Sequence, residues 1–194
     1  NFQMYTGDSA LHRAVILNSI DCVDALLTAN PNIDARSAGI VTPIMLAVSK
    51  KNQALFERLL SHGANPNQAA FNTSLLCKAV IDRLDIAPLL AAGADPNALS
   101  GNKYSPLCYA AKIGNLDACQ KLLAAGANPD ITCNDMTAEE IARGSGHGAI
   151  VTLFEEHKQL QVKIAALFEE QKRLLNTPEK RTAQDAELKQ RSSK

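Results

Sequence analysis

Apolar residues recur along most of the chain in a helical pattern that ends at regular intervals in a turn. The clearest marker is a Leu-Leu pair, and successive pairs are separated by 33, 30 and 33 residues. The pairs are Leu26-Leu27, Leu59-Leu60, Leu89-Leu90 and Leu122-Leu123. A glycine follows three of them, at the position where a left-handed residue ends a helix. The pattern therefore predicts a series of amphipathic helices of similar length.

A second series of residues lies upstream of each pair and predicts a shorter first helix. Its members are Ser or Thr, which cap helices by accepting a backbone N–H bond: Ser9, Thr42, Thr73, Ser105 and Thr137. Pro follows two of them, where the missing N–H costs nothing. One helix pair cannot bury its apolar face alone, so we expect consecutive repeats to stack.

The third repeat departs from this pattern. It is one residue short between its helices, in the segment 80–84, and it places Pro88 inside the second helix. Proline disrupts a helix interior because it lacks the N–H and its ring clashes with the preceding turn. We therefore expect this helix to start late or to bend.

The C-terminal segment carries a leucine every seven residues, at Leu153, Leu160, Leu167 and Leu174. Ile150 and Ile164 occupy the partner position of the heptad, which is interrupted by His157 and Gln171. The spacing predicts that the second helix of the fifth repeat continues to about residue 176, a length of roughly 40 Å. Residues 179–194 are polar, which predicts a weak helix or disorder.

Three interpretations of this heptad stripe remain open. The stripe packs back on the repeats as a cap, pairs with a second copy as a coiled coil, or binds another partner. Two polar residues in a seam of three to four heptads make the coiled coil marginal. If it forms, the homodimer contacts are the four leucines of the heptad.

Composition narrows the classes of partner. Net charge is +0 and the pI is about 7.1, so no basic surface for a nucleic-acid backbone is expected. No apolar run is long enough for membrane insertion. Five cysteines without Cys-x-x-Cys spacing are typical of reduced, mostly buried thiols in an intracellular, cytoplasmic protein. The first residue, Asn1 rather than Met, is typical of a piece of a longer protein.

The sequence contains no motif for catalysis. Its four histidines and five cysteines show neither His-x-x-x-His nor Cys-x-x-Cys spacing, so no metal is expected. The glycine-rich segment 144–148 lacks the lysine of a phosphate-binding loop, so no cofactor is expected either. We therefore predict that the chain is not an enzyme.

Together these motifs resemble the ankyrin repeat, whose signature is Thr-Pro-Leu-His-x-Ala-Ala, then Leu-Leu, then Gly-Ala-Asp/Asn-x-Asn. The resemblance implies an all-α solenoid of helix–loop–helix repeats with β-hairpin fingers, followed here by the long C-terminal helix. The repeats fall near 7–35, 36–67, 68–98, 99–130 and 131–157, which gives a repeat domain at 1–157 and a helical extension at 158–194. Only the first repeat keeps the signature histidine, His12, which the family uses to bond around its own turn. The matching residues are Met45, Leu76, Cys108 and Glu140.

The resemblance also implies a non-catalytic module that binds a protein or peptide along the concave surface of fingers and first helices. The residues expected there are Arg36, Val41, Lys50, Phe71, Asn72, Leu99, Asn102, Lys103, Tyr104, Lys112 and Ile113. Aromatic residues and arginine dominate interface energetics, which favours Tyr104, Phe71 and Arg36.

Three alternatives stand beside this reading. The chain is the targeting part of a larger enzyme whose catalytic domain lies elsewhere, or it is a scaffold dimerised through its coiled coil. A weaker similarity to ankyrin-containing effectors of intracellular bacteria implies a host protein as partner and host cytoplasm as location.

Overall fold

The computed structural model describes residues 7–38, 40–70 and 72–175. The chain forms two compact units, residues 1–151 and 152–194. The boundary between them, at 151/152, falls inside the last helix. The boundary expected from the sequence is 157/158.

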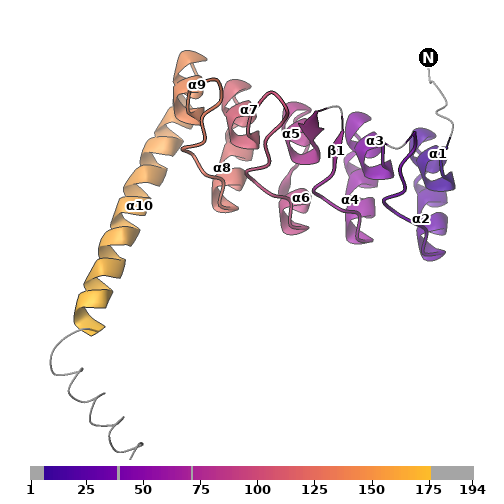
Figure 1. Ribbon diagram of the computed structural model, residues 1–194, viewed down its shortest axis with the longest axis horizontal. Helices are drawn as coiled ribbons and strands as arrows, with labels where there is room; N and C mark the ends of the chain where they lie inside the picture. Colours follow the sequence, from indigo (N-terminus) through magenta and orange to yellow (C-terminus); the bar gives the residue numbers. More distant parts are fainter. Residues whose placement is uncertain (1–6, 39, 71, 176–194) are drawn as a thin grey trace, which may run out of the picture. The chain divides into compact units, whose positions relative to one another are not determined.

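The first unit is a row of helix pairs, as the sequence predicted (Figure 1). First helices stand side by side in one row and second helices in another. The first helices are α1 (Ala10–Ile16), α3 (Pro43–Ser49), α5 (Leu75–Ile81), α7 (Pro106–Lys112) and α9 (Ala138–Gly144). The second helices are α2 (Ile20–Thr28), α4 (Gln53–Ser61), α6 (Ala87–Ala91), α8 (Leu116–Ala124) and the beginning of α10 (Gly148–Leu175). A hairpin of β1 (Ala69–Ala70) and β2 (Thr73–Ser74) is the regular sheet of the described chain.

An alanine stands at the fifth position of every first helix and is buried there. The five are Ala14, Ala47, Ala79, Ala110 and Ala142. Their small side chains allow neighbouring first helices to approach closely, and α7 contacts both α5 and α9. The carbonyl of each alanine also accepts the N–H that closes the following turn, as between Ala110 and Asn115 (2.9 Å). One residue therefore sets both the spacing of the row and the turn to the second helix.

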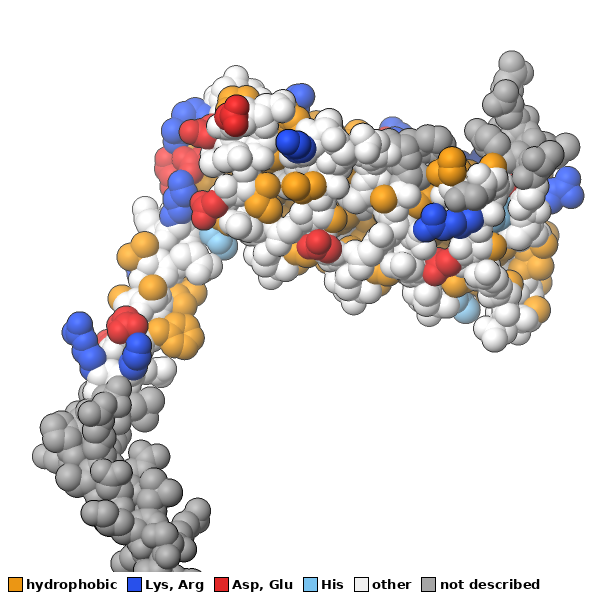
Figure 2. Space-filling view, viewed as in Figure 1, with side chains coloured by type: hydrophobic (Ala, Val, Ile, Leu, Met, Phe, Trp, Pro, Cys, Tyr) orange, Lys and Arg blue, Asp and Glu red, His pale blue; other side chains and the backbone are white. Residues whose placement is uncertain are grey.

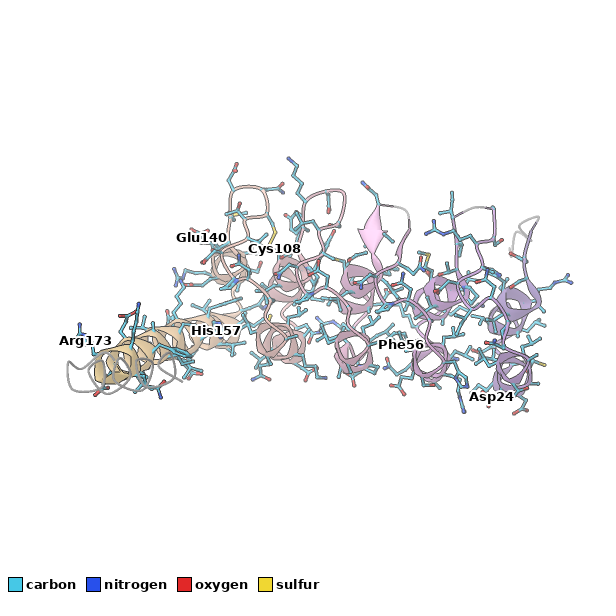
Figure 3. The ribbon with its side chains drawn as sticks, turned by 60° about the horizontal axis from the view of Figure 1, so that its bottom comes forward. Asp24, Phe56, Cys108, Glu140, His157 and Arg173 are labelled. Atoms are coloured by element: carbon cyan, nitrogen blue, oxygen red, sulfur yellow. A yellow bond between two sulfur atoms is a disulfide. The ribbon has the colours of Figure 1, made fainter. Side chains whose placement is uncertain are left out.

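The second helices supply the larger apolar side chains. In α4, Leu55, Phe56 and Leu59 are completely buried. The corresponding residues of the third repeat, counted back from its glycine, are Ile86 and Leu89, and they are buried as well. Figure 3 labels Phe56 beside α4, in the row of second helices.

The irregular third repeat behaves as predicted at its second helix. The helix α6 has only five residues and starts late, with Pro88 in its first turn. The carboxylate of Asp85 accepts the N–H of Ala87 (3.0 Å), which replaces the missing first turn. The proline is thus tolerated because the helix begins around it.

The start of the same repeat differs from the prediction by one residue. Thr73 belongs to strand β2, and the capping residue is Ser74, whose hydroxyl accepts the N–H of Cys77 (3.2 Å). Both residues belong to the hairpin, Thr73 paired with Ala70 and Ser74 with Ala69, and the helix begins directly after Ser74. Cys77, rather than Leu76, therefore occupies the position of His12.

Hydrogen bonds between turns join successive repeats. The Asn67 side chain accepts the N–H of Asp95 (2.8 Å) and donates to the carbonyl of Gly93 (3.0 Å). Asn97 makes the same two contacts one repeat later, with the N–H of Asn128 (2.8 Å) and the carbonyl of Gly126 (3.4 Å). The last residue of the Gly-Ala-x-Pro-Asn turn is therefore a staple that holds the next repeat.

The long helix α10 has 28 residues and ends close to the predicted residue 176. The helix α8 ends just before Gly126, which lies ten residues after the first residue of that helix and has positive φ. The corresponding residue of α10, ten residues after Gly148, is Lys158. Without a residue that adopts the left-handed conformation readily, the helix continues. The segment 179–194 lies outside the described residues.

We predict that Asn67→Ala lowers the free energy of unfolding by about 1–2 kcal/mol, because it removes two hydrogen bonds between repeats. Asp130→Ala is the matched control, since Asp130 stands at the same turn position of the last Leu-Leu repeat and no bond of its side chain to a following repeat is found in the described chain. Urea denaturation of both variants measures the difference. Equal stabilities would contradict the stapling role.

Candidate functional site

Loops between repeats project beyond the row of first helices, away from the second helices (Figure 3). We call them finger 2 (36–41), finger 3 (69–74), finger 4 (98–104) and finger 5 (133–136). The two sides of finger 2 meet in a short antiparallel bridge between Ser37 and Val41, and those of finger 5 in one between Cys133 and Met136. In finger 4 the N–H of Ser100 donates to the carbonyl of Tyr104 (2.9 Å).

Most residues predicted for the binding surface are exposed on these elements. Exposed are Arg36, Asn72, Leu99, Asn102, Lys103 and Lys112. Half-buried are Lys50, Tyr104 and Ile113. Phe71 lies outside the described residues. Val41 is only 8% exposed, because it forms the base of finger 2, and it is therefore removed from the predicted set.

Two tyrosines come together where finger 4 meets α7. The ring centroids of Tyr104 and Tyr109 are 5.1 Å apart, with the planes tilted by 35°. The Lys112 ammonium lies 5.2 Å from the centroid of the Tyr104 ring, within range of a cation–π interaction. We call Asn102, Tyr104, Tyr109, Lys112 and Asn134 the tyrosine cluster.

Both tyrosine hydroxyls are held by asparagines. The Tyr109 hydroxyl accepts from the amide of Asn102 (2.9 Å) and lies 3.0 Å from that side chain's oxygen. The Tyr104 hydroxyl accepts from the amide of Asn134 in finger 5 (3.1 Å). The cluster thus joins two fingers to one first helix, and its aromatic rings are oriented before any partner arrives.

Tyr109 and Asn134 were not among the predicted site residues. Tyr109 lies four residues after its cap Ser105, as Arg13 lies four after Ser9. The Tyr109 side chain reaches finger 4, where its hydroxyl bonds to Asn102, and its place in the helical register was the signal that could have found it. Asn134 had no such signal, because its place depends on how finger 5 folds.

The surroundings of the cluster are mixed in character. Leu99 is 52% exposed and Met136 is 45% exposed, while Lys103 adds a positive charge. Over the repeats, Figure 2 shows hydrophobic side chains in separate groups with few charged ones between them. This composition is typical of a surface for protein contacts.

Fingers 3 and 4 touch at a glycine. The N–H of Gly101 donates to the carbonyl of Asn72 (2.7 Å). A Cβ on Gly101 would lie 1.8 Å from the Asn72 side chain, so a larger residue would displace it. The absence of a side chain at 101 therefore permits the two fingers to stand in contact.

The signature histidine and its replacements also join repeats to fingers. His12 bonds locally to Ser9 through Nδ1, as expected, and its Nε2 donates to the carbonyl of Val41 in finger 2 (3.0 Å). Cys77 Sγ donates to the carbonyl of Ala98 at the start of finger 4 (3.5 Å). The position thus holds the next finger in place, beyond the local role that the resemblance implied.

At the same position in the fourth repeat the contact is covalent. Cys108 forms a disulfide with Cys133 of finger 5, across 25 residues of sequence. The expectation of five reduced thiols is therefore wrong for these two. Figure 3 shows Cys108 where α7 faces the fingers. The bond fixes the base of the finger that carries Asn134.

The remaining cysteines differ in exposure. Burial raises the pKa of the Cys77 thiol to about 11, against the opposing effect of the Ser74 hydroxyl. Burial alone raises the pKa of Cys119 to about 12. Cys22 is exposed. At neutral pH both buried thiols are protonated, and a buried thiol without thiolate character is a poor nucleophile.

In the described part of the chain, no group of three or more His, Cys, Asp or Glu side chains is placed to hold a metal ion. A shallow polar pocket of about 400 Å³ is lined by Asn18, Lys50, Lys51, Asn52 and Gln53. Among the described helices, none has the length and apolar character that crossing a bilayer requires.

Comparison with known proteins agrees with this architecture. A model of the family described as "Ankyrin repeats (3 copies)" matches residues 1–70 and 75–164. The chain belongs to the ankyrin-repeat family. Ankyrin repeats are general protein-interaction modules and are typically non-catalytic.

Ankyrin-repeat relatives include neurogenic locus notch homolog protein 1 of Mus musculus, 32% identical over 133 residues. That match covers 66% of this chain and 5% of the relative. Ankyrin repeat protein nuc-2 of Neurospora crassa is 30% identical over 142 residues, covering 71% of this chain and 13% of the relative. The chain thus matches a small part of much longer proteins. The similarity to bacterial effectors stays a prediction.

We predict a stepwise count of reactive thiols. The native protein at pH 8 exposes one, Cys22, since a pKa of about 11 leaves roughly one thiolate in a thousand at Cys77. Denaturant without reductant exposes three, and denaturant with reductant exposes all five. Titration with a chromogenic disulfide reagent measures each step.

The variant Cys108→Ser, Cys133→Ser is the control and keeps three thiols with or without reductant. Without the 25-residue loop closed by the disulfide, it unfolds about 3 kcal/mol more easily than the oxidised wild type. Five thiols from the wild type in denaturant alone would contradict the bond.

Proposed function

We propose that this chain is a non-catalytic module that binds a protein or peptide along its fingers and first helices, with the tyrosine cluster as the main contact. The observation that carries the proposal is the pair of tyrosines at 5.1 Å, fixed by asparagines from two fingers. The family supports it, because ankyrin repeats are interaction modules.

The cluster suits binding because its order is established in the free protein. Tyrosine supplies a large contact area with few rotatable bonds, so little conformational entropy is lost on binding. Here that loss is smaller still, since the hydroxyls are already bonded to Asn102 and Asn134. The exposed Leu99 and Met136 add apolar area around the rings.

The charges near the cluster indicate the polar part of the partner. Lys112 and Lys103 are both exposed there. An acidic side chain of the partner beside the Lys112 ammonium would gain a charge-assisted hydrogen bond without displacing the ammonium from the Tyr104 ring. We therefore expect an apolar segment with a carboxylate, rather than nucleic acid.

A second proposal concerns the larger context. Because the notch relatives extend far beyond the matched segment, this module serves as the targeting part of a longer protein. If the chain is instead an effector of an intracellular bacterium, its partner is a protein of the host cell. An intracellular, cytoplasmic location stays a prediction: the free thiol of Cys22 agrees with it, whereas a disulfide such as that between Cys108 and Cys133 is rare in that compartment.

The test begins with a partner captured from cell lysate, whose affinity is then measured with purified variants. We predict that Tyr104→Ala, Tyr109→Ala weakens binding about 30-fold or more, because tyrosines that act as hot spots contribute about 2 kcal/mol or more. Gln120→Ala, an exposed change on α8, is the control and should bind as the wild type does.

Thermal unfolding of the tyrosine variant separates a lost contact from a lost fold. Unchanged affinity in a folded variant would overturn the assignment of the cluster. Weaker binding in Arg36→Ala alone would place the contact at finger 2 instead.

A further inference from the structure

The helix α10 carries an apolar stripe with exposed side chains. From residue 158 to residue 173 every described side chain is exposed. Among them Leu160 is 54% exposed, Leu167 62% and Phe168 66%. These exposed side chains forgo the favourable free energy that burial of apolar area contributes. A long helix with this pattern gains stability only when another surface covers the stripe.

The stripe has the register of a coiled-coil seam. Leu160 and Leu167 occupy one core position of the heptad, and Ile164 and Gln171 occupy the other. Leu153 is half-buried, and the side chain of Leu174 lies outside the described residues. Val162 is 70% exposed but lies on the opposite side of the helix, away from the seam.

We propose that α10 pairs with α10 of a second copy of this chain, and that the two helices run antiparallel. Charge favours this direction. Residues flanking the seam at the g position are Lys163 and Glu170. In an antiparallel pair g positions face g positions, so Lys163 of each copy meets Glu170 of the other. In a parallel pair Lys163 faces Phe168 and Glu170 faces residue 175, with no opposite charges.

The polar seam residues lead to the same orientation. A parallel dimer places Gln171 against Gln171 of the second copy, and His157 against His157. The antiparallel register that joins Lys163 to Glu170 of the other copy stacks four layers of seam residues. Gln171 of one copy lies opposite Leu160 of the other in the two outer layers, and Ile164 lies opposite Leu167 in the two central layers. Each layer then contains at least one branched apolar side chain, and the centre of the seam is apolar throughout.

This dimer does not depend on the tyrosine cluster, which belongs to the repeats. The cluster is contained in residues 102–134, whereas the seam begins after residue 157. Failure of one proposal therefore leaves the other intact, and partner binding and self-association are measured separately.

Sedimentation equilibrium of the full chain tests the pairing. The expected result is a concentration-dependent mass above the 20.8 kDa monomer for the wild type. Leu160→Glu, Leu167→Glu should sediment as a monomer, while Val162→Glu, the matched control off the seam, should dimerise as the wild type does. A wild type that stays monomeric, or a dimer that survives the seam variant, would overturn the proposal.

Charge exchange tests the direction. Lys163→Glu and Glu170→Lys, each alone, should weaken the dimer at least threefold, because each places like charges opposite each other twice. The double exchange should restore the wild-type dissociation constant. If the single exchanges leave the dimer unchanged, the helices do not run antiparallel in this register. Circular dichroism of each variant confirms that the helices are retained.

Discussion

The close approach of first helices at a single alanine is the constraint on which the other features of the repeats depend. Alanine at this position lets α5, α7 and α9 stand in contact, and the same residue closes the turn to the second helix. The spacing of the fingers follows from the spacing of the helices that carry them. A bond such as that from Asn134 to Tyr104 spans two repeats, so it forms only when that spacing is short and regular.

The signature position shows how the family tolerates chemical change. Histidine, a thiol and a disulfide all occupy the third residue of a first helix, and each is joined to a finger further along the chain. The bonds differ in strength and in dependence on redox conditions, yet they connect the same two elements. In these three repeats the connection is the same, and the residue that makes it varies.

Much of the fold followed from the sequence because its signals are local. Caps, glycines and heptad leucines act within a few residues, and so the late start of α6 and the length of α10 were both predicted. Features that depend on contacts between distant segments were missed. Thr73 and Ser74 can both cap a helix, and the local sequence does not distinguish them; the structure uses Ser74. The partner of Cys108 lies 25 residues away, at a spacing that carries no signature. For the site, the exposed finger residues were foreseen, whereas the tyrosine cluster requires the relative placement of two fingers and a helix.

The asparagine staples have a direction, because each reaches from one turn to the turn of the following repeat. Any repeat that begins and ends with such a turn can be inserted between two others, since it receives a staple on one side and supplies one on the other. The last repeat is different: in place of a turn it has Lys158 and a continuing helix, so it offers no N–H to a staple in the usual place. Duplication of a repeat can therefore lengthen this array internally, whereas growth beyond α10 would first require the helix to acquire a stop.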